Sequence, residues 1–184
     1  QCELEKQLFG ISESVVAFRL CRKTMFQGRW LRYSDGFPVW IMRLVRKGRA
    51  HFSDCGHGEV AVPGIDGKMG TIREPFLHYP FSKGLEDWIA RHNQYSTREA
   101  ILERKASQCV SLSSLFSPDR AQRRSALRSL SRRMPFRPCL RFCYQYFLKL
   151  GFLDGKPGWT FSRLMAMYEA WIVLKRKEQE ADFE

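Results

Sequence analysis

The sequence predicts an α+β fold in which a small, mostly antiparallel sheet is followed by a helical half. Before residue 80, short runs of β-branched and aromatic residues alternate with turns that contain glycine or proline, which is typical of strands. After Ser82, apolar residues recur at three- and four-residue spacing, which is typical of amphipathic helices. We therefore divide the chain into a sheet portion, residues 1–80, and a helical portion, residues 81–184.

The sheet portion contains five expected strands that are joined by loops and tight turns. These strands are residues 14–22, 39–46, 49–52, 59–62 and 69–72. The sequence Asp66-Gly67-Lys68 should form a hairpin turn between the last two of them. Residues 25–38, with their glycines and proline, are expected to form a loop.

The helical portion begins with an amphipathic helix for which Ser82 can serve as the cap. Its expected buried face consists of Leu85, Trp88, Ile89, His92, Tyr95, Glu99 and Leu102. Because His92 falls inside this apolar stripe, it is expected either to contact a ligand or to make a hydrogen bond across the core. A tight loop is expected over residues 151–158, before a last helix at 159–178.

The composition is that of a folded protein that is attracted to acidic partners. Of 184 residues, 44% are apolar and 14% aromatic, which is enough for a full core. The formal net charge of +12 favours nucleic acid, phosphorylated substrates or anionic lipid as partners. The six cysteines form no C-x-x-C pair, so a zinc ribbon is not expected, and without a recognisable secretory signal they should be free thiols in the cytosol.

Residues 119–149 combine positive charge with apolar segments. They include nine basic residues and one acidic residue, and residues 140–150 are apolar nearly all round but too short to span a bilayer. Arginines beside aromatic-rich helices suit an element that lies on a membrane surface. The alternatives are an ordinary helical layer with solvated arginines and a basic nucleic-acid-binding module. The sequence argues against the nucleic-acid-binding module, because it contains no residue spacing typical of a helix-turn-helix or a zinc finger.

The candidates for chemistry lie between residues 54 and 93, where three of the four histidines occur. No Walker-type loop and no G-x-G-x-x-G, G-x-S-x-G or H-E-x-x-H motif is present. A carboxylate near histidines suits a general base that deprotonates a hydroxyl, and nearby lysine and arginine suit a diphosphate or sugar phosphate. The polar candidates are Asp54, His57, Glu59, His78, Lys83, Arg91, His92 and Asn93.

Several sequence blocks, taken together, are similar to those of one enzyme family. The blocks are Gly56-His57-Gly58-Glu59 and residues 26–32, 43–44, 74–79, 81–85 with Trp88, 91–96, 99–100, and 151–158 followed by 168–169 and 174–175. They resemble the C-terminal half of bacterial family 2 glycosyltransferases of exopolysaccharide and lipopolysaccharide biosynthesis. The resemblance implies a GT-A fold, a divalent metal (Mg²⁺ or Mn²⁺), and inverting transfer of a sugar from a nucleotide-sugar to a lipid-linked or polysaccharide acceptor. It also implies a peripheral location at the cytoplasmic face of the cell membrane.

The resemblance further implies roles for individual residues. Glu59 matches the acceptor-side general base, with Asp54 and His57 as rivals for that role. His78 matches a histidine that helps to hold the metal or the diphosphate. The residues matched to the acceptor or diphosphate side are Lys83, Arg91, His92, Asn93 and Arg29.

One element of the family pattern is missing, because the sequence contains no D-x-D metal motif. The nucleotide-binding half of such an enzyme needs this motif to clamp the leaving diphosphate. We therefore expect the chain to be a truncated, C-terminal portion that does not transfer sugar alone. A non-catalytic scaffold that binds the membrane and a partner enzyme is the alternative.

Overall fold

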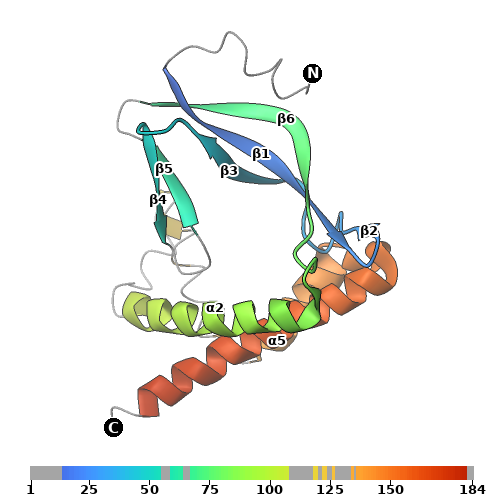
Figure 1. The fold of residues 1–184 in the computed structure, drawn as a ribbon. Coiled ribbons are helices and arrows are strands. Elements are labelled where there is room, and N and C mark those ends of the chain that lie inside the picture. Colours follow the sequence, from blue (N-terminus) through green and yellow to red (C-terminus); the bar gives the residue numbers. More distant parts are fainter. Residues whose placement is uncertain are drawn as a thin grey trace.

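The structure is a computed structural model that describes most of the chain between residues 14 and 181. The described residues are 14–54, 59–63, 67–107, 118–119, 122–123, 126, 134 and 136–181, with the backbone alone at 50–54, 59–63 and 105–107. In this part of the chain the fold is α+β, as the sequence predicts: a sheet lies on one side and a helical layer on the other (Figure 1).

The central element of the sheet is β1, Val15–Phe26. It pairs along its length with β3, Val39–Val45, and with β6, Lys68–His78, while β2, Arg29–Trp30, pairs with its end. Residues on both faces of β1 are buried, which is why this strand is apolar in a nearly continuous run. Phe18 and Leu20 of β1 pack with Ile72 of β6 in the core of the sheet.

The pairing of β6 differs from the sequence prediction. The predicted hairpin at residues 66–68 is wrong, because β6 pairs with β1 in parallel and not with the preceding strand. That preceding strand, β5 at Glu59–Pro63, instead forms a separate antiparallel pair with β4, Ala50–Asp54. Pro75 lies within β6, and a proline is tolerated there because only one edge of β6 is paired among the described strands.

In the described part of the chain, the helical layer includes two long helices and three short pieces that lie between them in sequence. The long helices α2, Gly84–Ser107, and α5, Gly155–Ala181, cross beneath the sheet (Figure 1). Glu86 and Asp87 lie in the first turn of α2, where negative charge stabilises the helix dipole. The short pieces are α4, Arg137–Cys143, the π-helix η2, Tyr144–Leu148, and the 3₁₀-helix η3, Gly151–Asp154. No helix of the described chain is both long and apolar enough to cross a membrane.

The predicted loop at residues 151–158 is wrong, because these residues form η3 and the first turn of α5. The glycines there allow close packing. A Cβ on Gly158 would lie 2.2 Å from the carbonyl oxygen of Gly151, and one on Gly151 would lie 2.6 Å from that of Gln145. The polar Lys149, just before this block, lies against Gly36 of the loop after β2.

The buried face of α2 is rotated relative to the predicted one. Trp88 and His92 are buried as predicted, but Leu85, Ile89 and Leu102 are exposed. The buried face instead includes two small residues, Ser96 and Ala100, and one charged residue, Glu103. Small residues are needed because α5 packs closely here, with Tyr168 and Ile172 against Ala100. Hydrophobicity alone therefore did not identify this face.

Glu103 can be buried because it takes part in an ion cluster that joins three helices. Arg137 of α4 donates from both of its terminal nitrogens to Glu103, each at 2.8 Å, and also pairs with Glu169 of α5 at 2.6 Å. Arg176 lies 3.8 Å from the same Glu103 carboxylate. The side chains of Arg137, Glu103 and Glu169 are all largely buried, so their charges depend on one another.

Replacing Arg137 with methionine should lower the free energy of unfolding by about 3–5 kcal/mol, because two buried carboxylates lose their partner. Urea denaturation followed by circular dichroism measures this. The exposed Lys177 of α5, changed to methionine, serves as the control and should change stability by less than about 0.5 kcal/mol. Equal stability of the two variants would contradict a structural role for the cluster.

Candidate functional site

The loop between β2 and β3 is held by the carboxylate of Asp154 in η3. This carboxylate accepts hydrogen bonds from the backbone N–H groups of Arg32 at 3.1 Å, Tyr33 at 3.1 Å and Ser34 at 2.7 Å. It also accepts one from the Ser34 hydroxyl at 2.6 Å. Asp154 is buried, and a buried carboxylate is tolerated only when donors of this kind surround it. The bonds join residues more than 100 positions apart.

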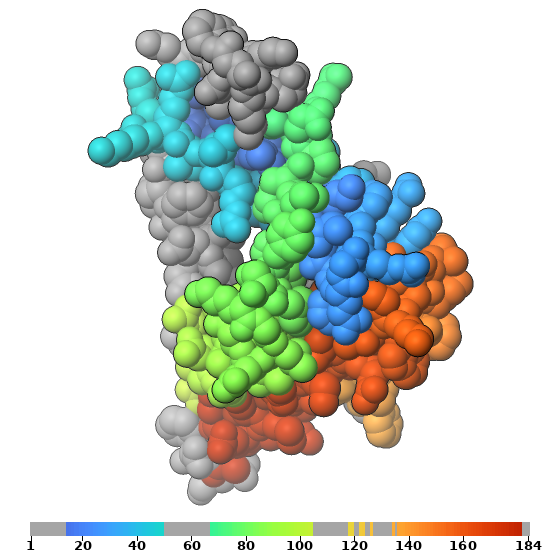
Figure 2. All heavy atoms as spheres, turned by 45° about the vertical axis from the view of Figure 1, so that its right-hand side comes forward, coloured from blue at the N-terminus to red at the C-terminus, as the bar shows by residue number. Residues whose placement is uncertain are grey.

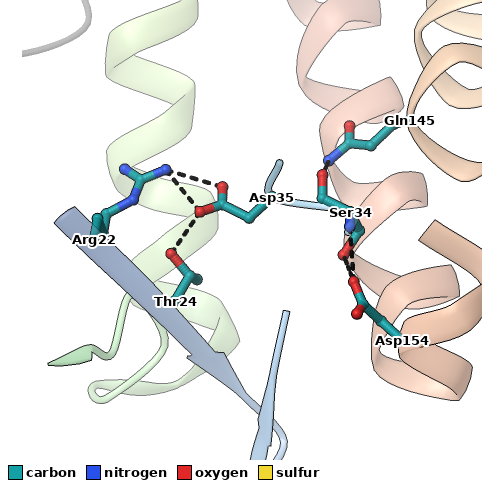
Figure 3. A network of polar contacts seen from close by, with 6 residues as sticks. All are labelled: Arg22, Thr24, Ser34, Asp35, Gln145 and Asp154. Atoms are coloured by element: carbon teal, nitrogen blue, oxygen red, sulfur yellow. Dashed lines mark hydrogen bonds and ion pairs between the residues drawn. The ribbon is translucent and has the colours of Figure 1, made fainter. Parts of the chain in front are cut away.

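The same loop is tied to the sheet by the next residue, Asp35 (Figure 3). Its carboxylate accepts two hydrogen bonds from Arg22 of β1, both at 2.9 Å, and one from the Thr24 hydroxyl at 2.7 Å. On the other side, Gln145 of η2 donates to the Ser34 carbonyl at 2.7 Å. The adjacent residues Ser34 and Asp35 thus connect the helical layer with the sheet.

A group of positive charges surrounds His78 at the end of β6. His78 pairs in parallel register with Thr24 on β1, and Phe76 of β6 with Arg22. Arg43 of β3 lies over the ring of Phe76, at 5.8 Å from its centroid. We call His78, Arg22, Arg43 and Arg91 the basic cluster; Asp35 is its carboxylate neighbour.

The protonation of His78 reflects these surroundings. Burial lowers the pKa of this half-buried imidazole below 6.5, and the positive charges of Arg22, Arg43 and Arg91 lower it further, whereas Asp35 raises it. A neutral imidazole beside three guanidinium groups can donate or accept a hydrogen bond. A planar guanidinium group can donate two parallel hydrogen bonds to the oxygens of a phosphate, so the cluster is suited to a phosphate or diphosphate.

The described neighbours of His78 do not make up a donor set for a divalent metal. The nearest carboxylate, Asp35, is already bonded to Arg22 and Thr24, and the remaining neighbours are cationic. Among the described residues, no group of three or more His, Cys, Asp or Glu side chains could hold a metal ion. The divalent metal implied by the family resemblance stays a prediction, and no step below is routed through it.

His92, predicted to bind substrate or to bond across the core, is largely buried at 8% exposure. Its Nδ1 lies 2.8 Å from the carbonyl oxygen of Trp88, and its ring stacks on the Trp88 indole at a centroid distance of 3.6 Å. Tyr95 and Tyr168 contact the other sides of the imidazole. The bond to Trp88 lies within α2, and the ring contacts join α2 to Tyr168 of α5, so they describe a packing role for His92; ligand contact and a hydrogen bond across the core both stay predictions.

The other residues predicted on the acceptor side are Arg91 and Asn93 on α2, Lys83 just before it, and Arg29 on β2. Arg91 bonds to Asp87 and to the carbonyl oxygen of Pro80, and its charge reaches His78. Asn93 accepts two hydrogen bonds from Lys175 of α5, each at 2.6 Å. Lys83 is exposed before α2, and Arg29 is exposed on β2 beside Gly155.

Two of the three candidates for a general base, Asp54 and Glu59, lie on the β4–β5 pair. Asp54 ends β4 and Glu59 begins β5, and their Cα atoms are partners in the antiparallel register. The backbone therefore places two carboxylate-bearing residues opposite each other at one end of a hairpin. His57 lies outside the described residues.

Sequence reasoning missed the residues that organise this region. Asp154 and Asp35 were not among the candidates, nor were Arg22 and Arg43. Asp154 belongs to the block at residues 151–158 that resembles the glycosyltransferase family. An aspartate in a glycine-rich segment often accepts hydrogen bonds from backbone N–H groups, and this signal could have identified it. The contribution of Arg22 and Arg43 depends on strand pairing, which the sequence pattern does not reveal.

Comparison with known proteins adds no assignment, because no protein-family model, no curated protein and no solved structure matches the chain.

Replacing Asp154 with asparagine should destabilise the protein by about 2–4 kcal/mol, because several hydrogen bonds to a charged acceptor become bonds to a neutral one. Thermal and urea unfolding measure the loss. Glu74→Gln, on an exposed side chain of β6, removes the same charge and should leave stability nearly unchanged. If both variants unfold alike, Asp154 does not hold the loop.

His78 should titrate below pH 6.5 in the folded protein, and Arg43→Gln should raise its pKa because one positive charge is removed. The unfolded state therefore binds a proton on His78 at a higher pH than the folded state does. The contribution of His78 to the free energy of unfolding is present above pH 6.5, and it is lost as the pH falls through the lower pKa of the folded state. NMR titration of the imidazole measures both pKa values. The control Arg49→Gln, in the exposed turn after β3, should leave the pKa of His78 where it is; an unchanged pKa in Arg43→Gln would exclude a charge effect of Arg43.

Proposed function

We propose that this chain forms the acceptor-side part of an inverting family 2 glycosyltransferase. The enzyme would transfer a sugar from a nucleotide-sugar to a lipid-linked or polysaccharide acceptor in cell-surface glycan biosynthesis. It would act at the cytoplasmic face of the cell membrane.

One observation carries this proposal: two blocks that resemble the family, far apart in sequence, meet in the structure. Asp154, in the block at residues 151–158, bonds to the backbone of Arg32, which ends the block at residues 26–32. The glycines of the later block are required by packing, as shown above for Gly151 and Gly158. A third block, at residues 74–79, includes His78 of the basic cluster. The resemblance thus involves residues that depend on one another physically, which supports a common origin of the blocks.

The chemistry of the basic cluster suits the leaving group of such a reaction. During transfer, the bond from the sugar C1 to the donor diphosphate breaks as a bond from the acceptor oxygen to C1 forms, and negative charge develops on the diphosphate. Preorganised cations next to a developing charge lower the barrier more than they would in bulk water. Arg22 is already fixed by Asp35, so it would meet the diphosphate with little loss of side-chain freedom.

The proton of the acceptor hydroxyl needs a base, and Glu59 remains our candidate, with Asp54 and His57 as rivals. Glu59 begins a strand at the end of a hairpin, opposite Asp54 in the register. A carboxylate at this position is suited to accept the proton of a hydroxyl as a general base.

In the native protein, Glu59→Gln should lower kcat by about 10²–10⁴-fold, because the amide cannot accept the hydroxyl proton. Binding of the nucleotide-sugar should stay within about twofold, since proton abstraction concerns the acceptor. Transfer of a radiolabelled sugar to membrane-derived acceptor and equilibrium binding of the donor measure the two quantities.

Glu86→Gln, on the exposed first turn of α2, is the matched control and should keep full activity. Asp54→Asn tests the rival carboxylate in the same assay. Near-normal turnover of Glu59→Gln would assign the base elsewhere.

A non-catalytic scaffold that binds a membrane or a partner enzyme is the second candidate. It is favoured by the many exposed apolar side chains of residues 136–159, which no described part of the chain covers. Sugar transfer that responds to Glu59→Gln or Asp54→Asn would favour the enzyme, whereas membrane binding without any transferase activity in the native protein would favour the scaffold.

A further inference from the structure

Five aromatic rings gather where η2, η3 and the start of α5 meet. The half-buried rings of Phe142 and Tyr146 stack at a centroid distance of 5.3 Å. Phe147, Phe152 and Trp159 pack edge-on against them, with centroid distances between 5.1 and 6.3 Å. We call these five residues the aromatic cluster.

The outer members of the aromatic cluster are open to solvent. Phe147 is 55% exposed, and Phe152 and Trp159 are each 43% exposed. Two leucines next to them in sequence are also exposed, Leu148 at 76% and Leu153 at 52%. In Figure 2 the orange segment that contains these residues lies on the molecular surface, beside the blue segment that contains β1 and β2. A soluble monomer rarely keeps so large an apolar patch without a partner.

The charges around the aromatic cluster are positive. Between residues 136 and 163 there are five basic residues and one acidic residue, Asp154. Asp154 is buried and bonded to the loop after β2, so its carboxylate does not contribute to the exposed surface. Lys156 and Arg163 are exposed, and Arg141 is partly exposed. Within residues 136–163, the exposed side chains of this surface are therefore apolar or cationic, and none is a carboxylate.

Basic residues and a tryptophan alternate along one face of α5. Lys156, Trp159 and Arg163 are separated by three and four residues, so they lie along one face of the helix. The indole of Trp159 is thus flanked on both sides by a cation. Tryptophan between basic residues is the pattern of helices that lie at a membrane interface, with the ring at headgroup depth and the cations at the lipid phosphates.

We propose that the aromatic cluster, with Leu148, Leu153, Lys156 and Arg163, docks onto an anionic lipid bilayer. This names the surface by which the chain reaches the membrane face assigned to it under the proposed function, but lipid binding does not itself require sugar transfer. Rings and leucines enter the interface, and the cations bind lipid phosphate groups.

Two other occupants fit the surface less well. A second copy of the chain would bring the same cations against each other, which opposes self-association. Single-stranded nucleic acid would need ring faces free for stacking, whereas Phe142 and Tyr146 stack on each other and the remaining rings pack against them edge-on.

Vesicle flotation tests the proposal, with phosphatidylcholine vesicles that contain or lack phosphatidylglycerol. The wild-type chain should float with the anionic vesicles and much less with the neutral ones. The double variant Phe147→Glu/Leu148→Glu should reduce the partition coefficient by about tenfold or more, because charged groups replace the inserting side chains. Both residues are exposed, so the variant should keep the fold, which circular dichroism and urea unfolding check.

Matched controls distinguish lipid binding by this surface from nonspecific hydrophobic adsorption and from an effect of net charge alone. Leu174→Glu changes another exposed leucine of α5, at 64% exposure, outside the proposed surface and should float as wild type does. Lys156→Glu/Arg163→Glu should weaken flotation with anionic vesicles, whereas Lys47→Glu/Lys177→Glu, with the same change in net charge at exposed sites elsewhere, should have a much smaller effect.

A depth measurement gives an independent readout. Lipid brominated on its acyl chains should quench the tryptophan fluorescence of the wild-type chain, and Trp159→Phe should remove most of that quenching while leaving flotation largely intact. The proposal is overturned if Phe147→Glu/Leu148→Glu floats like the wild type, or if the surface variants instead abolish binding of single-stranded DNA or dimer formation. Because the readout is lipid binding, loss of transferase activity in the Glu59 or Asp54 variants does not affect it.

Discussion

The carboxylate of Asp154 is the group on which the arrangement of the molecule depends. It is buried between the sheet and the helical layer, and its negative charge is balanced by three consecutive backbone amides and one hydroxyl. Because those donors belong to the loop after β2, the carboxylate determines the path of that loop. The path in turn places Asp35 within reach of Arg22 and Thr24. A single side chain thus links the position of the last helix to the charges on the sheet.

This link connects two surfaces of different chemistry through one network of hydrogen bonds. The basic cluster lies on the sheet and includes Arg91 of α2, and the aromatic cluster lies on α4, η2, η3 and α5. Between them runs the loop that Asp154 and Gln145 hold from the helical side. Under our proposals, the first surface meets a diphosphate and the second meets lipid. A fixed relation between them would hold the reacting phosphate at a constant height above the bilayer.

The limits of sequence reasoning follow from what each pattern encodes. The alternation of β3 was sufficient to predict its bounds to within a residue, because one strand's periodicity is a local property. The parallel pairing of β6 with β1 is not local, and the turn sequence at residues 66–68 indicated the wrong partner.

The helical half shows the same division between local pattern and packing. Ser96 and Ala100 are buried because they are small enough for α5 to approach, and Glu103 is buried because Arg137 neutralises it. Neither reason is visible in a count of hydrophobic residues. In the same way, the glycines at 151 and 158 were read as signs of a loop, although their role is to let two helical segments touch.

The position of β1 at the centre of the sheet also bears on how the chain is made. Its antiparallel partner β3 is synthesised soon after it. Its parallel partner β6 is synthesised much later, because Thr71, which bonds to Arg19 of β1, follows it by 52 residues. During that interval the backbone N–H and C=O groups along one edge of β1 have no strand beside them. Contacts of such separation form slowly, and an open edge of this kind is where newly synthesised chains associate with one another. Nascent protein would therefore need protection until the segment ending at His78 has emerged.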